Sequence, residues 1–137
     1  MSKKFRKISV LILVPVLVCL LSITAFADSQ WSDYRDYGSN YVDAFANITR
    51  YETSGTITSQ EAGNNLYVGA TYRYYPSGGA SLVTEDEAAA SSRYYAQVSF
   101  YNTGIHAMYN ASYVFRADVY NPTGTDYWRP NTVVVTY

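Results

Sequence analysis

Few residues of this sequence have the types and spacing that catalysis needs. The chain has one histidine, His106, and one cysteine, Cys19. No G-x-S-x-G segment or similar context marks a serine as the nucleophile of a Ser–His–acid arrangement. The alternating pattern around His106 places it on a polar strand face, where an ordinary exposed histidine is the simpler interpretation. The sequence therefore predicts no catalytic residue and a protein that is not an enzyme.

The acidic residues give no clearer site. A paired-carboxylate hydrolase needs two acids that face one cleft. The densest acidic run, residues 85–87, follows Thr84, and Thr84 with Glu87 matches a helix capping box, which explains these acids structurally. Neither this run nor residues 28–36 has the D-x-D-x-D-G spacing of a calcium loop. We expect no metal site and no cofactor.

The feature that points to a function is a set of tyrosines. The chain has 16 of them, and the alternation of side chains along the expected strands directs several away from the core. Aromatic faces with interleaved polar groups stack on sugar rings or anchor protein partners, because tyrosine gives a large contact area at low entropic cost. The expected ligand-binding residues are Tyr67, Tyr75, Tyr95, Tyr101, Tyr120, Arg73 and Arg116.

A structural interpretation of the same tyrosines stays open. Tyrosine favours strands and pairs across them, and a second layer of chain could cover this face. Asp118 lies two residues from Arg116 on the same expected face, and we expect it to be the ion-pair partner of that arginine.

The clearest strand pattern lies in residues 94–120. Polar and apolar residues alternate over 94–101, and the alternation resumes over 105–120 after the turn residues Asn102, Thr103 and Gly104. This predicts a β-hairpin with one buried face, on which Ala107 and Tyr109 lie. The second limb is about twice as long as the first, so its far half must pair elsewhere, with a bend or bulge at 110–112.

Similar but shorter patterns occupy the rest of the chain. Strands are expected at 41–51, 56–58, 66–75, 80–83 and 132–137, with turns at 52–55, 76–79 and 121–124. The capping box and the following alanines predict one short helix from Glu85 to about Ser92. Residues 28–40 are expected to form an irregular arm tied down by Trp31. We predict an all-β fold, a single antiparallel β-sandwich of six to eight strands with one short helical insertion. A small β-barrel is the alternative.

The first 27 residues have the pattern of a secretory signal peptide. Basic residues at 3–7 precede an apolar run at 8–26, and Ala25-Phe26-Ala27 supplies the small-x-small cleavage site. A transmembrane anchor is the alternative, against which Pro15 and the cleavage site both count. The prediction is a signal peptide at 1–27 and a single domain at 28–137. Membrane contact is then expected only through the signal before cleavage.

Removal of the signal changes the charge and the chemistry of the chain. The only cysteine and all three lysines would leave with it, and residues 28–137 keep six arginines and eleven acids, a net charge of −5. Nucleic acid is therefore not an expected partner, because phosphate neutralisation needs a basic patch. Every remaining cation is a planar guanidinium that can stack on a tyrosine ring.

These features together favour a secreted, extracellular binding module for a glycan or protein on a cell surface. A lysine-rich start with an A-x-A exit is typical of bacterial export. The alternative is a secreted bacteriocin-like or toxin-like protein that acts on neighbouring bacterial cells, which the small size and the lack of a catalytic motif permit. The acidic charge counts against it, because most agents that target anionic envelopes are basic.

Overall fold

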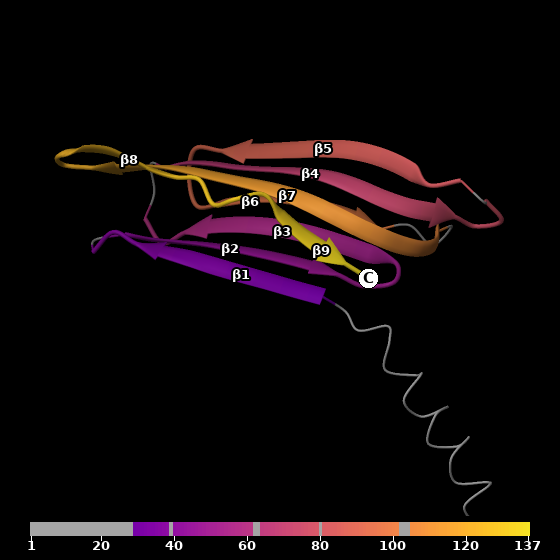
Figure 1. The fold of residues 1–137 in the computed structure, drawn as a ribbon. Coiled ribbons are helices and arrows are strands. Elements are labelled where there is room, and N and C mark those ends of the chain that lie inside the picture. The colour runs from indigo at the N-terminus through magenta and orange to yellow at the C-terminus, as the bar shows by residue number, and fades with distance from the viewer. Residues whose placement is uncertain (1–28, 39, 62–63, 80, 102–104) are drawn as a thin grey trace, which may run out of the picture.

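The protein is a β-sandwich of two antiparallel sheets packed face to face. The computed structural model describes residues 29–38, 40–61, 64–79, 81–101 and 105–137, without the side chains of Ile105 and His106. Figure 1 shows the two layers, with β4, β5 and β7 in one and β1, β2 and β3 in the other. The described residues form nine strands, more than the six to eight expected, and the sheets do not close into a barrel.

The four-stranded sheet has the order β1-β2-β3-β6. Its strands are β1 (Ser29–Asp36), β2 (Tyr41–Ile48), β3 (Glu52–Ser59) and β6 (Tyr95–Tyr101). The five-stranded sheet has the order β5-β4-β7-β8, and β9 also pairs with β7. Its strands are β4 (Asn65–Pro76), β5 (Val83–Ser91), β7 (Ile105–Asn121), β8 (Gly124–Trp128) and β9 (Val133–Thr136). The long β7 is therefore the organising strand of its sheet.

The core lies between the sheets and follows the two-residue alternation of the strands. Val42, Ala44, Ala46 and Ile48 of β2 are buried, as the sequence predicts. The same holds for the inward residues of β4, which are Leu66, Val68, Ala70, Tyr72 and Tyr74. Each of these strands therefore presents the intervening residues to the outside of the sandwich.

A chain of aromatic contacts crosses the core from one edge of the four-stranded sheet to the other. It begins at Trp31 of β1, which ties this segment down as expected, and reaches Phe100 of β6, whose ring also contacts Tyr74 of β4. The centroid distances are 5.5 Å for Trp31–Phe115, 5.9 Å for Phe115–Tyr113, 6.5 Å for Tyr113–Tyr72, 5.2 Å for Tyr72–Phe100 and 4.9 Å for Phe100–Tyr74. These spacings suit favourable stacked and edge-on ring pairs, so the chain joins the two sheets.

Tyr113 of β7 packs closely against β3 of the opposite sheet. Its ring lies against Gly55 of β3, where an added Cβ would be 2.4 Å from a ring carbon. Its hydroxyl lies 2.5 Å from the Thr53 hydroxyl, which itself donates to the Asn47 carbonyl at 2.6 Å. Because a threonine hydroxyl has one proton, Tyr113 is the donor to Thr53. Burial raises the pKa of the Tyr113 hydroxyl, so it stays protonated.

The expected hairpin over residues 94–120 is wrong. β6 pairs with β3 in the four-stranded sheet, whereas β7 pairs with β4, β8 and β9 in the other. The residues between them, 102–104, lie outside the described part of the chain. Alternation defines which side chains share a face, but it does not identify the partner strand, and β4 offers β7 a longer match than β6 does.

A bulge in β7 also changes the expected faces. The partner of Arg73 is Asn110, but the partner of Tyr74 is Met108, so Tyr109 is an extra residue on β7. Met108 is consequently buried and Tyr109 exposed, the reverse of the prediction. The irregularity lies one residue before the expected segment 110–112.

The expected helix at 85–92 is also wrong, because this segment is β5 and pairs with β4 along its whole length. The local preference of alanine and the capping box is overridden by the hydrogen-bonding edge that β4 presents. For a similar reason the expected arm contains β1, and the expected turn at 52–55 lies within β3. The described residues contain no helix long and apolar enough to cross a membrane.

The fit between Gly55 and Tyr113 gives the first prediction. Gly55→Ala should lower the free energy of unfolding by about 1–3 kcal/mol, because the added methyl overlaps a buried ring that has no free volume to move into. Urea unfolding followed by tryptophan fluorescence measures this change. The control is Thr56→Ser on the outward side of the same strand, expected within about 0.5 kcal/mol of wild type. Equal effects of the two variants would contradict the prediction.

Two core tyrosines should respond oppositely to loss of the hydroxyl. Tyr113→Phe removes the hydrogen bond to Thr53 and should cost about 1–2 kcal/mol of stability. The buried Tyr72 hydroxyl lies near the Glu87 carboxylate but makes no hydrogen bond of standard geometry with the described residues, so Tyr72→Phe should leave stability unchanged or raise it by up to about 1 kcal/mol. Urea unfolding of both variants tests the pair. A loss in Tyr72→Phe as large as in Tyr113→Phe would show that Tyr72 is hydrogen-bonded.

Candidate ligand-binding surface

The structure does not bring the seven predicted binding residues onto one face. Five share the outward side of the five-stranded sheet, and two lie on the outward side of the other sheet, across the core. The first group consists of Tyr67, Arg73 and Tyr75 of β4 with Arg116 and Tyr120 of β7, and the second consists of Tyr95 and Tyr101 of β6. The first group therefore defines the candidate surface.

Even within the first group, the residues lie at two ends. Arg73 is six residues from Tyr67 on β4, a separation of about 20 Å along an extended strand. Tyr75 lies at the same far end, where its ring meets the ring of Tyr109 edge-on at 6.2 Å. Tyr67 and Arg116 are directly opposite each other on β4 and β7. The near end of the sheet thus holds the closest group of candidate residues.

Two adjoining hollows lie on this face and share Tyr67 and Arg116. One, of about 460 Å³, is what we call the arginine groove, and its polar lining consists of Asn65, Tyr67, Ser91, Ser92, Arg116, Asp118 and Arg129. The other, of about 440 Å³, runs over Gly69 and Ala88. Its lining combines the small residues Gly69 and Ala88 with Arg116 of β7. Its size lies within the range of small-molecule sites.

Tyr67 supports Arg116 and does not offer the free stacking surface that was predicted. The Arg116 guanidinium carbon lies 5.1 Å from the centroid of the Tyr67 ring. The other end of Tyr67 extends over Gly69, where an added Cβ would be 2.6 Å from the tyrosine hydroxyl. Gly69 faces outward yet is buried, because Tyr67 covers it. The missing side chain at Gly69 therefore lets the ring lie along β4 beneath the guanidinium.

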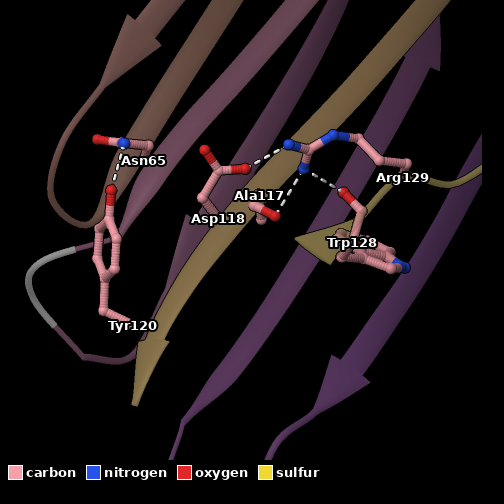
Figure 2. Close-up of polar contacts among 6 residues, drawn as sticks. All are labelled: Asn65, Ala117, Asp118, Tyr120, Trp128 and Arg129. Atoms are coloured by element: carbon pink, nitrogen blue, oxygen red, sulfur yellow. Dashed lines mark hydrogen bonds and ion pairs between the residues drawn. The ribbon is translucent and has the colours of Figure 1, made fainter. Parts of the chain in front are cut away.

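Arg129 is held by several contacts at once, as Figure 2 shows. Its guanidinium forms an ion pair with Asp118, and it donates to the Ala117 carbonyl at 2.7 Å and to the Trp128 carbonyl at 2.9 Å. Its guanidinium carbon also lies 5.4 Å from the centroid of the Tyr127 ring. The expected Asp118–Arg116 pair is wrong, because the β7–β8 pairing brings Arg129 to Asp118. Arg116 has no ion-pair partner among the described side chains.

Two tyrosine rings border the arginine groove. The Asn65 amide donates to the Tyr120 hydroxyl at 2.6 Å and orients that ring (Figure 2). Asp118 pairs with Tyr127, and Tyr120 pairs with Thr125, so Tyr120 and Tyr127 are diagonal neighbours on one face. Tyr120 is 50% exposed and Tyr127 68%. Both rings are therefore exposed at this end of the sheet, and the Arg129 guanidinium lies over one face of Tyr127 only.

Sequence reasoning missed Asn65, Tyr127 and Arg129. None of the three was among the expected ligand-binding residues. The position of Tyr127 could have been predicted from the turn at 121–124. If this turn closes a tight hairpin in which Asn121 pairs with Gly124, Tyr127 pairs with Asp118. Asn65 could not be found in this way, because its contact depends on the pairing of distant strands.

The second group has a simpler environment. Tyr95 and Tyr101 stand near opposite ends of the edge strand β6, and the Tyr95 hydroxyl bonds the Gln97 side chain between them. Both tyrosines are exposed, so substitutions at these two positions can serve as controls for substitutions in the first group.

The described residues offer no cluster of three or more histidine, cysteine, aspartate or glutamate side chains that could hold a metal ion. His106 belongs to β7, but its side chain lies outside the described part of the chain. The acids at 85–87 alternate along β5, so Asp86 points to the outer hollow and accepts from Thr71, while Glu85 accepts from Tyr74. The chain matches no protein-family model and no curated protein by sequence.

The seat of Tyr67 over Gly69 can be tested directly. Gly69→Ala should displace the Tyr67 ring from beneath Arg116 and change stability by less than about 1 kcal/mol, because the added methyl meets only the hydroxyl end of Tyr67, which can move outward. The side-chain proton shifts of Arg116 in NMR spectra report its position over the ring. Tyr67→Leu serves as the reference for complete loss of the ring. Unchanged Arg116 shifts in Gly69→Ala, with a clear change in Tyr67→Leu, would contradict this arrangement.

Proposed function

We propose that the protein is a secreted, non-enzymatic binding module for a glycan on a cell surface, and that the glycan binds at the arginine groove. The observation that carries this proposal is the position of Tyr120 and Tyr127 beside polar groups held in fixed geometry. A sugar ring has an apolar C–H face that packs on an aromatic ring, and its edge carries hydroxyls that need directed partners. The Asn65 amide, the Asp118 carboxylate and the Arg129 guanidinium supply such partners.

A glycan suits this surface better than a protein partner does. Protein interfaces concentrate their energy in well-packed, desolvated centres, where aromatic residues and arginine are enriched and aspartate and serine are depleted. Here the lining of the groove is mainly polar and includes Asp118 and two serines, and the exposed rings of Tyr120 and Tyr127 lie beside it, in contact with Asn65 and Arg129. The polar side chains are already oriented by neighbours, so little conformational entropy is lost when a hydroxyl-rich ligand binds.

A retention assay tests the proposal. Purified residues 28–137 are mixed with insoluble polysaccharides and with washed bacterial cell envelopes, and the bound fraction is measured. Wild type should be retained on at least one glycan fraction. The double variant Tyr120→Ala/Tyr127→Ala should weaken retention about tenfold or more, because each stacked ring contributes roughly 0.5–1.5 kcal/mol beyond its buried area.

The matched control is Tyr95→Ala/Tyr101→Ala, which removes two exposed tyrosines from the opposite sheet. It should bind like wild type. Loss in this variant with retention in the first would move the site to the four-stranded sheet. No retention of wild type on any fraction would reject glycan binding, and inhibition of bacterial growth would then favour the toxin-like alternative.

A further inference from the structure

We propose that the ligand of the arginine groove is an anionic polysaccharide, and that Arg116 binds its oxyanion group, a carboxylate or a sulfate. This inference rests on the proposed function and specifies the class of glycan. It follows from the distribution of charge within the groove, from the way in which Arg116 is supported, and from the hydroxyl and amide groups beside it.

The groove has an uncompensated positive charge. Its lining contains two arginines and one acid, Asp118, whose carboxylate forms the ion pair with Arg129. Arg116 therefore keeps its full charge with no ion-pair partner among the described side chains. The adjoining hollow contains Asp86 and Glu87 on β5, and Asp86 accepts a hydrogen bond from Thr71 at 2.6 Å. The lining of the arginine groove is therefore net positive, although residues 28–137 have a net charge of −5. A locally positive groove attracts an anion.

Arg116 is held ready for such an anion. The Tyr67 ring lies beneath its guanidinium at 5.1 Å, and Tyr67 is itself fixed over Gly69. Stacking on a ring restricts a long side chain and leaves the N–H groups at the edge of the guanidinium free to donate. That planar fork matches two oxygens of one oxyanion, which makes a pair of parallel, charge-assisted hydrogen bonds possible.

The neighbours of Arg116 distinguish a sugar from a simple anion. Ser91 and Ser92, from the end of β5, and Asn65 line the same groove. Their hydroxyl and amide groups can each donate to and accept from a sugar hydroxyl. Tyr120 and Tyr127 provide stacking surfaces at the border. An oxyanion on a sugar therefore uses the charge, the polar rim and the rings together.

Matched polymers test the inference. The binding of residues 28–137 is measured on polygalacturonate against its methyl ester, and on dextran sulfate against dextran, because the members of each pair share one sugar backbone and only one of them carries the anionic groups. One acidic polymer should bind at least about tenfold more tightly than its neutral counterpart, and added salt should weaken the binding. Arg116→Gln should abolish this preference. Arg73→Gln makes the same change of charge on the same outward face, far from the groove, and should preserve it.

Each other outcome has a defined meaning, provided that thermal unfolding shows both variants to be folded. Equal binding to the acidic and neutral members of both pairs would overturn the anion inference and leave glycan binding intact. Equal losses in Arg116→Gln and Arg73→Gln would also overturn it, because the preference would then reflect overall charge. Binding to none of these polymers, nor to any envelope fraction, would reject the proposed function as well.

Discussion

The contact between Tyr113 and Gly55 determines how the two sheets fit together. The ring occupies the space that a side chain at Gly55 would fill, and its hydroxyl reaches Thr53 in the opposite sheet. Packed interiors have little free volume, so a ring seated in this way fixes both the separation of the sheets and the position of β7 along β3. The aromatic contacts on either side of Tyr113 extend this constraint to both edges of the four-stranded sheet.

The candidate site depends on the same constraint because β7 carries both. Phe115, Ala117 and Val119 point into the core, and the residues between and after them, Arg116, Asp118 and Tyr120, point outward. A shift of one residue in the pairing of β7 would bury Arg116 and expose Phe115, at a prohibitive cost in free energy. The packing of the core therefore selects the register that forms the arginine groove, although none of the inward residues of β7 lines that groove.

Local alternation predicted the faces of β2, of β4 and of β7 after its bulge, because those patterns repeat over several residues of one strand. It could not give the partner of β6, since strand pairing is a contact between distant segments. The prediction at β5 was wrong for a different reason. The alanines favoured a helix there, but the segment pairs with the free edge of β4 instead. The same holds for the site. The outward position of Arg116 could be predicted from the alternation. Its lack of an ion-pair partner among the described residues could not, because that depends on the ion pair that Asp118 forms with Arg129 across the β7–β8 pair.

The use of arginine as the only cation in residues 28–137 has a physical consequence in the folded protein. Three guanidinium groups lie over tyrosine rings at 5.1–5.4 Å, those of Arg50, Arg116 and Arg129. Arginine stacking on tyrosine was expected from composition, and it is confirmed here. A lysine at position 116 would carry the same charge on a flexible, strongly hydrated stem that makes no planar contact with Tyr67. The Tyr67 ring therefore restricts the Arg116 side chain and orients the N–H groups of its guanidinium.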